Sequence, residues 1–227
     1  MKLIKPYYEI RTPINGEEIL IAIEQAARTC YKSEERIEVI SGHATSARTF
    51  VSKLISRGHE AMLEFGGMIN VLFVCDRGVS HELVRHRVAS FAQESTRYCN
   101  YNKDDITFII PNWITELPDI KTLNTKVFDN TISNEEGCIL TWYDSCEFAE
   151  ESYKELINHG WTPQQARSVL PNSLKTEINV SANIREWRHI FRLRASKAAH
   201  PSMRELMIPL LEEFKSKIPI LFDDINY

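Results

Sequence analysis

One apolar run constrains the fold more than any other part of the chain. Residues 68–75 are almost continuously apolar and rich in Val, Ile and Phe, and a polar Asp-Arg-Gly tripeptide ends the run. A short apolar run that ends at turn residues is typical of a buried strand. Ser80 has the chemistry of a helix N-cap. The sequence therefore predicts a buried strand followed by a helix that begins at residues 81–88.

Basic and polar side chains follow this strand closely. Arg85, His86, Arg87 and Arg97 lie within a stretch of thirteen residues. Hydroxyl and amide side chains lie among them: Ser90, Gln93, Ser95, Thr96 and Tyr98. Guanidinium groups stay charged and suit phosphate oxygens, and hydroxyls can complete an anion site. A solvated basic face is the alternative, but the position just after a buried strand favours a site for a phosphorylated ligand.

A second cluster of arginines lies near the C-terminal end. With about 100° of rotation per helical residue, residues 183–194 form two faces. The polar face holds Arg185, Arg188, His189 and Arg192, and the apolar face holds Ile184, Trp187, Ile190 and Phe191. Asn183 and Arg194 project toward the apolar side. A buried arginine needs a partner, which can be an anionic ligand or a glutamate of the same chain.

Composition limits the class of protein. The chain has 227 residues, which fits a single domain over residues 1–227. Its net charge of −4 argues against a surface that attracts nucleic acid or an anionic membrane. No apolar run approaches the ~20 residues of a membrane helix, and the N-terminus has no signal-peptide core. The five cysteines form no CxxC pair, so we expect a cytoplasmic protein with no disulfide framework and no metal site.

Other segments give a coarse secondary structure. Strands are predicted at residues 2–10, 106–110 and 176–181. Helices are predicted at residues 17–30, 44–57 with Gly58 as the C-cap, 137–158, and from Pro163 through Arg167. Residues 112–135 show no clear pattern.

The first cluster resembles the signature of the flavin-dependent thymidylate synthases. It reads Arg85-His86-Arg87, seven residues, Ser95, one residue, and then Arg97-Tyr98. Segments at 58–60, 167–171 and 183–194 resemble other parts of that family, and the matching stretch runs from about residue 26 to about 205. The resemblance implies an α+β fold with a mostly antiparallel sheet packed with helices. No GxGxxG loop is present, so arginines are expected to bind the flavin.

The resemblance also implies a reaction. It is the reductive methylation of dUMP to dTMP, with 5,10-methylenetetrahydrofolate as the carbon donor. Side chains cannot supply a hydride, so a cofactor must; in this family it is FAD reduced by NADPH. A homotetramer with shared active sites is implied as well.

Individual site residues follow from the same resemblance. Those implied for FAD are His59, Ala61, Arg85, His86, Arg87, Gln93, Asn183, Ile184, Arg185 and His189. Those implied for dUMP are Glu82, Arg85, Gln93, Glu94, Ser95, Thr96, Arg97, Arg167 and Arg194. Arg167 is expected to hold the phosphate. Arg194 is the expected catalytic residue, because its fixed charge can stabilise anionic character on the uracil ring.

Four positions depart from the family pattern. Ala61 stands where a small hydroxyl residue is common, and Phe65 where a second histidine is common. Glu82 stands where glutamine is frequent, and His189 replaces an asparagine of some members. A backbone contact at Ala61 can survive its substitution, but a side-chain role cannot.

Other functions are considered beside this one. The aromatic and arginine-rich segment 183–194 could bind single-stranded nucleic acid, although the acidic net charge argues against it. Cys99 could be the nucleophile of a cysteine-dependent methylase. Ser95 could also act as a nucleophile, but no base lies at a defined distance from it, so a binding hydroxyl is favoured.

Overall fold

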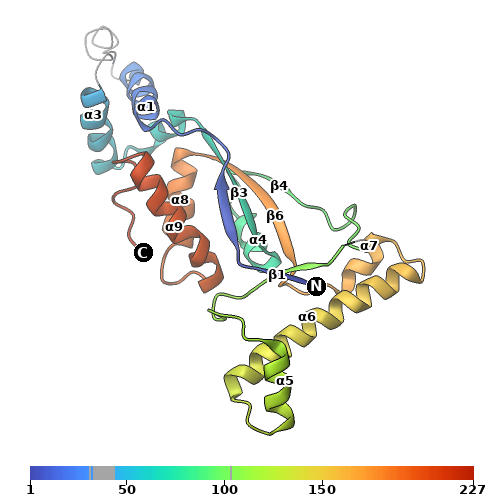
Figure 1. The fold of residues 1–227 in the computed structure, drawn as a ribbon. Helices are drawn as coiled ribbons and strands as arrows, with labels where there is room; N and C mark the ends of the chain where they lie inside the picture. The colour runs from blue at the N-terminus through green and yellow to red at the C-terminus, as the bar shows by residue number, and fades with distance from the viewer. Residues whose placement is uncertain (31, 33–43, 103) are drawn as a thin grey trace. The chain divides into compact units, whose positions relative to one another are not determined.

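The computed structural model describes residues 1–30, 32, 44–102 and 104–227. Residues 31, 33–43 and 103 of the stretch that resembles the family lie outside the described residues. The chain divides into two compact units (Figure 1). The first unit consists of Met1–Pro6, Val74–His81 and Gln93–Glu177, and the second consists of Tyr7–Phe73, Glu82–Ala92 and Ile178–Tyr227. The single catalytic domain stays a prediction.

A four-stranded sheet has the order β2 (Tyr7–Ile10), β3 (Met68–Asp76), β6 (Lys175–Asn183) and β4 (Ser90–Gln93). β3 is the predicted apolar strand, and its residues Val71, Phe73 and Cys75 are fully buried. β6 alternates as predicted, since every second residue from Thr176 to Ala182 is fully buried. The predicted α+β class with an antiparallel sheet is confirmed.

The strand predicted over residues 2–10 is wrong as one element. It is divided into β1 (Lys2–Ile4) and β2, and the two belong to different sheets. Pro6 lies at the break, where it has no N–H group to donate to a ladder. β1 pairs in parallel with β5 (Thr107–Ile109) in a sheet of two strands.

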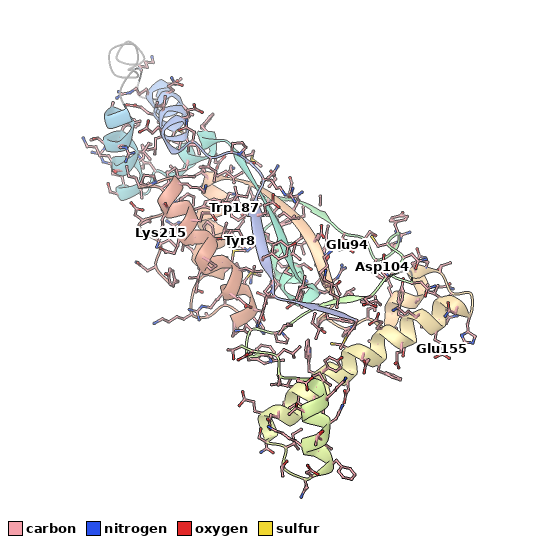
Figure 2. All side chains as sticks on the ribbon, in the orientation of Figure 1. Tyr8, Glu94, Asp104, Glu155, Trp187 and Lys215 are labelled. Atoms are coloured by element: carbon pink, nitrogen blue, oxygen red, sulfur yellow. The ribbon has the colours of Figure 1, made fainter. Side chains whose placement is uncertain are left out.

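The second unit contains helices and an aromatic core. Its helices are α1 (Gly16–Cys30), α3 (Ala44–Ser56), the 3₁₀ helix η2 (Glu60–Gly66), α8 (Ile184–Arg194) and α9 (Pro201–Lys217). Trp187, Phe191, Phe214 and Phe222 are fully buried and stack with centroids 5.1–5.7 Å apart. The indole N–H of Trp187 donates to the Ile69 carbonyl of β3 at 3.1 Å, which fixes α8 on the sheet (Figure 2).

The helix predicted after β3 begins earlier than expected. α4 spans Arg77–Leu83, so the prediction of Ser80 as its N-cap and of a helix over 81–88 is wrong. The carboxylate of Asp76 accepts the Val79 N–H at 2.7 Å and caps the helix instead. The chain then forms turns, with the His86 N–H donating to the Leu83 carbonyl. The Arg85-His86-Arg87 segment therefore lies on turns and not on a helix.

The first unit is built around a long helix. Its helices are α4, α5 (Ile120–Phe128), α6 (Asn134–Asn158), α7 (Pro163–Ala166) and the 3₁₀ helix η3 (Arg167–Val169). α6 begins three residues before the predicted start, because Ser133 and Glu136 form a capping box. Its core consists of Ile106, Phe108, Cys146, Tyr153, Ala166 and Leu174. Among the described helices, none combines the length and the apolar character that crossing a bilayer requires.

Candidate functional site

Arg194 lies at the end of α8 and is the most constrained arginine of the predicted site. Its Nη1 atom lies 2.6 Å from the Glu82 carboxylate, and its Nη2 atom donates to the Glu82 carbonyl at 2.9 Å. Its Nε atom donates to Nε2 of His86 at 3.0 Å. The structure therefore brings together three predicted residues, and it gives Arg194 the internal ion pair that was the alternative to an anionic ligand.

His86 is buried beneath this guanidinium. Its Nδ1 atom lies 3.5 Å from the carboxylate of Glu186, and its ring meets His189 edge to face at 5.6 Å. Burial, followed by the charges of Arg194 and His189, lowers the pKa of His86 to about 4. The imidazole is therefore neutral at neutral pH, and it can accept a hydrogen bond.

A pocket of about 470 Å³ lies beside this cluster in the second unit. The residues that line it are Glu60, Glu64, Val88, Asn183, Arg185, Glu186, His189 and Arg192. It therefore collects three of the residues implied for FAD, namely Asn183, Arg185 and His189. Its volume lies in the ~300–1,000 Å³ range of small-molecule sites.

The side chain of Asn183 has a structural task as well. Its amide oxygen accepts the Glu186 N–H at 2.9 Å and caps α8. Arg185 pairs with Glu64 at 2.6 Å. Ile184 is fully buried, so only its backbone can meet a ligand without repacking of the core. His59, Ala61, Arg85 and Arg87 are exposed.

Arg188 and Arg192 join α8 to the C-terminal segment. Arg188 is fully buried; it bonds the Asp224 carboxylate at 2.7 Å, Glu60 at 3.0 Å and the Leu221 carbonyl. Arg192 reaches Glu60 at 2.7 Å. The Arg192 hydrogen bond, with help from Arg188, lowers the pKa of Glu60 despite its partial burial. This network holds the helix that carries Arg185, His189 and Arg194.

The remaining predicted residues lie in the first unit. Arg167 is exposed, and its Nη1 atom donates to the buried Thr96 hydroxyl at 3.1 Å. Arg97 donates to Gln164 at 3.0 Å, and the Ser95 hydroxyl accepts the Arg97 N–H at 3.3 Å. These contacts bring Thr96 and Arg167 together although they are 71 residues apart.

Gln93 and Glu94 are held by neighbours of the same unit. The Gln93 amide donates to the hydroxyls of Ser80 and Thr176, at 2.9 and 3.1 Å. The Glu94 carboxylate accepts from the Tyr101 hydroxyl at 2.7 Å and pairs with Lys175 at 3.1 Å. Burial and then the Glu94 hydrogen bond raise the pKa of Tyr101. Tyr101 therefore stays a phenol that donates to Glu94.

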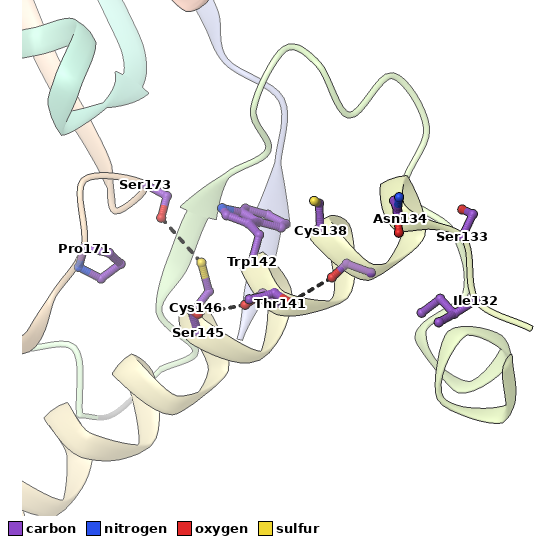
Figure 3. A pocket seen from close by; sticks show the side chains of 11 residues that line it. Ile132, Ser133, Asn134, Cys138, Thr141, Trp142, Ser145, Cys146, Pro171 and Ser173 are labelled. Carbon is purple, nitrogen blue, oxygen red and sulfur yellow. Dashed lines mark hydrogen bonds between the residues drawn. The ribbon is translucent and has the colours of Figure 1, made fainter. Parts of the chain in front are cut away.

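A larger groove of about 730 Å³ in the first unit contains none of the predicted site residues. Figure 3 shows Trp142 beside it and the Cys146 thiol directed at the Ser173 hydroxyl, 3.4 Å away. The hydroxyls of Thr141 and Ser145 already donate to carbonyls one turn earlier in α6. Burial raises the pKa of Cys146, so this thiol is a poor nucleophile.

Three carboxylates of the site were missed from the sequence. Glu60 follows His59 in a segment that the family resemblance already marked, so its position was a usable signal. Glu186 lies next to Arg185 on a helix that was predicted. Asp224 had no such signal, because only the folded chain brings it to Arg188.

The chain is similar to proteins of one known family. A family model described as "Thymidylate synthase complementing protein" matches residues 17–220. Proteins named flavin-dependent thymidylate synthase are similar over most of their lengths. The relative from Geobacter sulfurreducens is 31% identical over 89% of this chain and 80% of its own, and that from Corynebacterium efficiens is 32% identical over 95% and 82%. The relative from Pyrococcus furiosus is 33% identical over 86% and 70%.

A solved structure has a similar fold. It is the UMP/dUMP methylase PolB from Streptomyces cacaoi bound with 5-Br dUMP. The TM-score is 0.76, with 21% sequence identity over 98% of this chain and 96% of that chain.

Proposed function

The chain belongs to the family of flavin-dependent thymidylate synthases, and we propose that it methylates dUMP to dTMP. In the proposed reaction 5,10-methylenetetrahydrofolate supplies the carbon and NADPH supplies the reducing equivalents through FAD. The methylene carbon of the folate bonds to C5 of the uracil ring, which loses its proton, and the hydride converts this carbon to the methyl group. The two folate nitrogens released from the carbon take up two protons, the one lost from C5 and one from solvent. The products are dTMP, tetrahydrofolate and NADP⁺.

The environment of Arg194 is the observation that carries this proposal. Its guanidinium is held from three directions by His86 and by two groups of Glu82, and 19% of its side chain is exposed. A cation whose position is fixed in this way can stabilise negative charge that develops on a uracil ring as C5 attacks. We assign Arg194 as the catalytic residue.

Binding of the nucleotide is proposed to depend on a positively charged side chain. Arg167 is proposed to hold the phosphate, because its hydrogen-bond partner is a neutral hydroxyl that leaves its charge available. The other residues proposed for dUMP are Glu82, Arg85, Gln93, Glu94, Ser95, Thr96 and Arg97.

The pocket of the second unit suits a polar cofactor. It offers the guanidinium groups of Arg185 and Arg192, the imidazole of His189 and the exposed apolar side chain of Val88. FAD supplies the hydride when it is bound. The residues proposed to hold it are His59, Ala61, Arg85, His86, Arg87, Gln93, Asn183, Ile184, Arg185 and His189.

We also propose a homotetramer in which active sites are shared between chains. The carboxylates that line the pocket offset much of its positive charge, so further cations from a second chain would favour the diphosphate of FAD. Phe65 and Val88 are large apolar residues of this unit with 59% and 70% exposure, as expected for a surface that another copy covers. The cysteine usage supports a cytoplasmic location.

Absorbance and turnover test the proposal. The purified protein should bind FAD, absorb blue light, and form dTMP when dUMP, methylenetetrahydrofolate and NADPH are supplied. The Arg194→Ala variant should keep its flavin and lose dTMP formation by about 10²–10³-fold, the usual effect of removing one preorganised donor. The control is Arg11→Ala, which removes an exposed arginine paired with Glu9. Normal dTMP synthesis by Arg194→Ala would disprove the assignment.

The two alternative functions predict different results. Trp187 and Phe191 are fully buried, so the aromatic rings of α8 are not available to stack on nucleobases. We therefore expect no salt-dependent gel shift with single-stranded oligonucleotides. A cysteine-dependent methylase would lose all turnover in Cys99→Ser, whereas we expect this variant to stay active.

A further inference from the structure

A chain of four polar side chains runs through the second unit. It leads from Glu186 to His86, from His86 to Arg194, and from Arg194 to Glu82. The three contacts measure 3.5, 3.0 and 2.6 Å. Glu186 and His86 are buried, with 7% and 4% exposure. No role in binding or catalysis has been assigned above to Glu186.

The hydrogen-bonding chemistry of arginine identifies the tautomer of His86. A guanidinium group donates hydrogen bonds and never accepts them. Since Nε of Arg194 donates to Nε2 of His86, that ring nitrogen must carry its lone pair. A neutral imidazole then carries its proton on Nδ1. This is the nitrogen that faces the carboxyl group of Glu186.

Glu186 is well placed to favour this tautomer. It lies in the first turn of α8, and its backbone N–H is held by the Asn183 side chain. The distance of 3.5 Å is long for an ordinary hydrogen bond. The low dielectric of a protein interior strengthens the attraction between a carboxylate and an N–H dipole, however, so a contact of this length can still set the tautomer.

A divalent cation is the competing interpretation of these residues. His86, Glu186 and His189 offer ligand atoms that all lie within 4.8 Å of one another. A cation shared with Glu186 would take the Nδ1 lone pair of His86 and move the proton to Nε2. That proton would then face the Nε–H of Arg194, and two donors cannot bond each other. The contact between Arg194 and His86 therefore favours a proton on Nδ1 over a metal ion.

We propose that Glu186 is a positioning residue, which fixes the tautomer of His86 and through it the orientation of the Arg194 guanidinium. The consequence for dTMP synthesis rests on the function proposed above for Arg194. Without an acceptor at position 186, the His86 proton can move to Nε2. The imidazole then repels the Nε–H of Arg194, and the guanidinium turns away.

The tautomer can be measured without any assay of activity. The chain has seven histidines, and ¹⁵N-histidine labelling of the whole flavin-loaded protein reports the protonation of each ring nitrogen. A His86→Gln spectrum assigns the His86 signals. We expect Nδ1 protonated and Nε2 unprotonated in the natural protein and in Glu186→Gln, whose amide oxygen still accepts. In Glu186→Ala we expect the proton to be shared between both nitrogens.

Kinetics then connect the tautomer to the reaction. Glu186→Ala should lower kcat by about 10–100-fold, by analogy with the loss of a hydrogen-bond partner that orients a metal-bound histidine. The KM for dUMP should change much less, and Glu186→Gln should restore most of kcat. The control is Glu151→Ala, an exposed residue of α6. A general loss of folding would lower the yield of both Glu186 variants, and the spectrum of the natural protein would still test the tautomer.

Three results would overturn the proposal. They are a proton on Nε2 in the natural protein, an unchanged His86 signal in Glu186→Ala, and a shift of the His86 signals when Zn²⁺ alone is added. If the spectra agree with the proposal and no dTMP forms under any condition, the proposed function fails while the role of Glu186 toward His86 remains.

Discussion

Arginine side chains have different kinds of partner in the two units. In the first unit, Arg167 donates to the Thr96 hydroxyl and Arg97 to the Gln164 amide, and both of these partners are neutral. In the second unit, four arginines of α8 lie 2.6–2.7 Å from a carboxylate. They are Arg185, Arg188, Arg192 and Arg194.

The difference concerns what an arginine can do for a ligand. A guanidinium that bonds a neutral group keeps its net charge and can attract a phosphate directly. One that pairs with a carboxylate is already compensated, and its position is fixed by that pair. Arginines of the first unit are therefore suited to capture an anion, whereas those of α8 are suited to hold a geometry. An anion that binds on α8 therefore meets a carboxylate already paired with each of these arginines.

The largest effect on stability is expected from Arg188→Met. Arg188 is fully buried and bonds two carboxylates and a carbonyl. Its removal leaves Asp224 with Arg192 as its one remaining cationic partner in the described part of the chain, so we expect unfolding to need about 2–4 kcal/mol less free energy. Urea denaturation measures this. The matched control is Arg192→Met, whose side chain is 42% exposed and should cost less than about 1 kcal/mol. Equal losses would remove the distinction between buried and exposed pairs.

The next effect concerns capture of the nucleotide. Arg167→Ala removes a charge that no carboxylate compensates among its described hydrogen bonds. We expect the KM for dUMP to rise about tenfold, with a smaller change in kcat, as for loss of a charged hydrogen bond. The KM of the natural protein should also rise with salt, and that of the variant should depend on salt less. The control is Arg48→Ala, which removes an arginine that is 42% exposed and lies 3.7 Å from the Glu17 carboxylate. Equal salt dependence in Arg167→Ala and in the natural protein would contradict the comparison.

Local patterns predicted much of the fold. The apolar run of β3 and the alternation of β6 were sufficient, because burial on a sheet leaves a direct trace in the sequence. The position of α4 was wrong because Asp76 competes with Ser80 as a cap, and only the backbone geometry decides between them. α9 was not predicted, although Pro201 at its first turn and the apolar spacing from Met203 to Phe214 were usable signals.

The candidate site was predictable as a set of residues but not as a network. The family resemblance implied Arg194, His86 and Glu82 position by position, and it did not imply that the three side chains touch. Contacts such as that between Arg188 and Asp224 join residues 36 positions apart. Such pairs depend on tertiary packing, which neither periodicity nor a motif encodes.

Asp224 gives a pH-dependent test of the carboxylate network. Burial opposes ionisation of this carboxyl group, but its bonds to Arg188 and Arg192 outweigh burial and lower its pKa. A carboxyl group whose pKa is lower in the folded protein than in the unfolded chain stabilises the fold at pH values above its unfolded pKa of about 3.9. This stabilisation is lost as the pH falls through the pKa of the folded protein. The natural protein should therefore exceed Asp224→Asn in stability at pH 7, by about 1 kcal/mol after allowance for solvent exposure. Urea denaturation should show that this difference in stability shrinks below about pH 4. A difference that grows below about pH 4 would contradict the lowered pKa of Asp224.

The smallest effect is expected at the exposed pair of Glu64 and Arg185. Both side chains are about half exposed, at 48% and 49%, so Glu64→Gln should change the free energy of unfolding by less than about 0.5 kcal/mol. The same change releases Arg185 from its carboxylate. If compensation weakens anion binding on α8, the variant should hold FAD about two- to threefold more tightly, since a rim charge pair is worth well under 1 kcal/mol. Titration of the flavin-free protein with FAD measures this. Weaker FAD binding by Glu64→Gln would mean that the Glu64 carboxylate orients Arg185 for the cofactor. The ion pairs of the α8 arginines would then favour ligand binding and not weaken it.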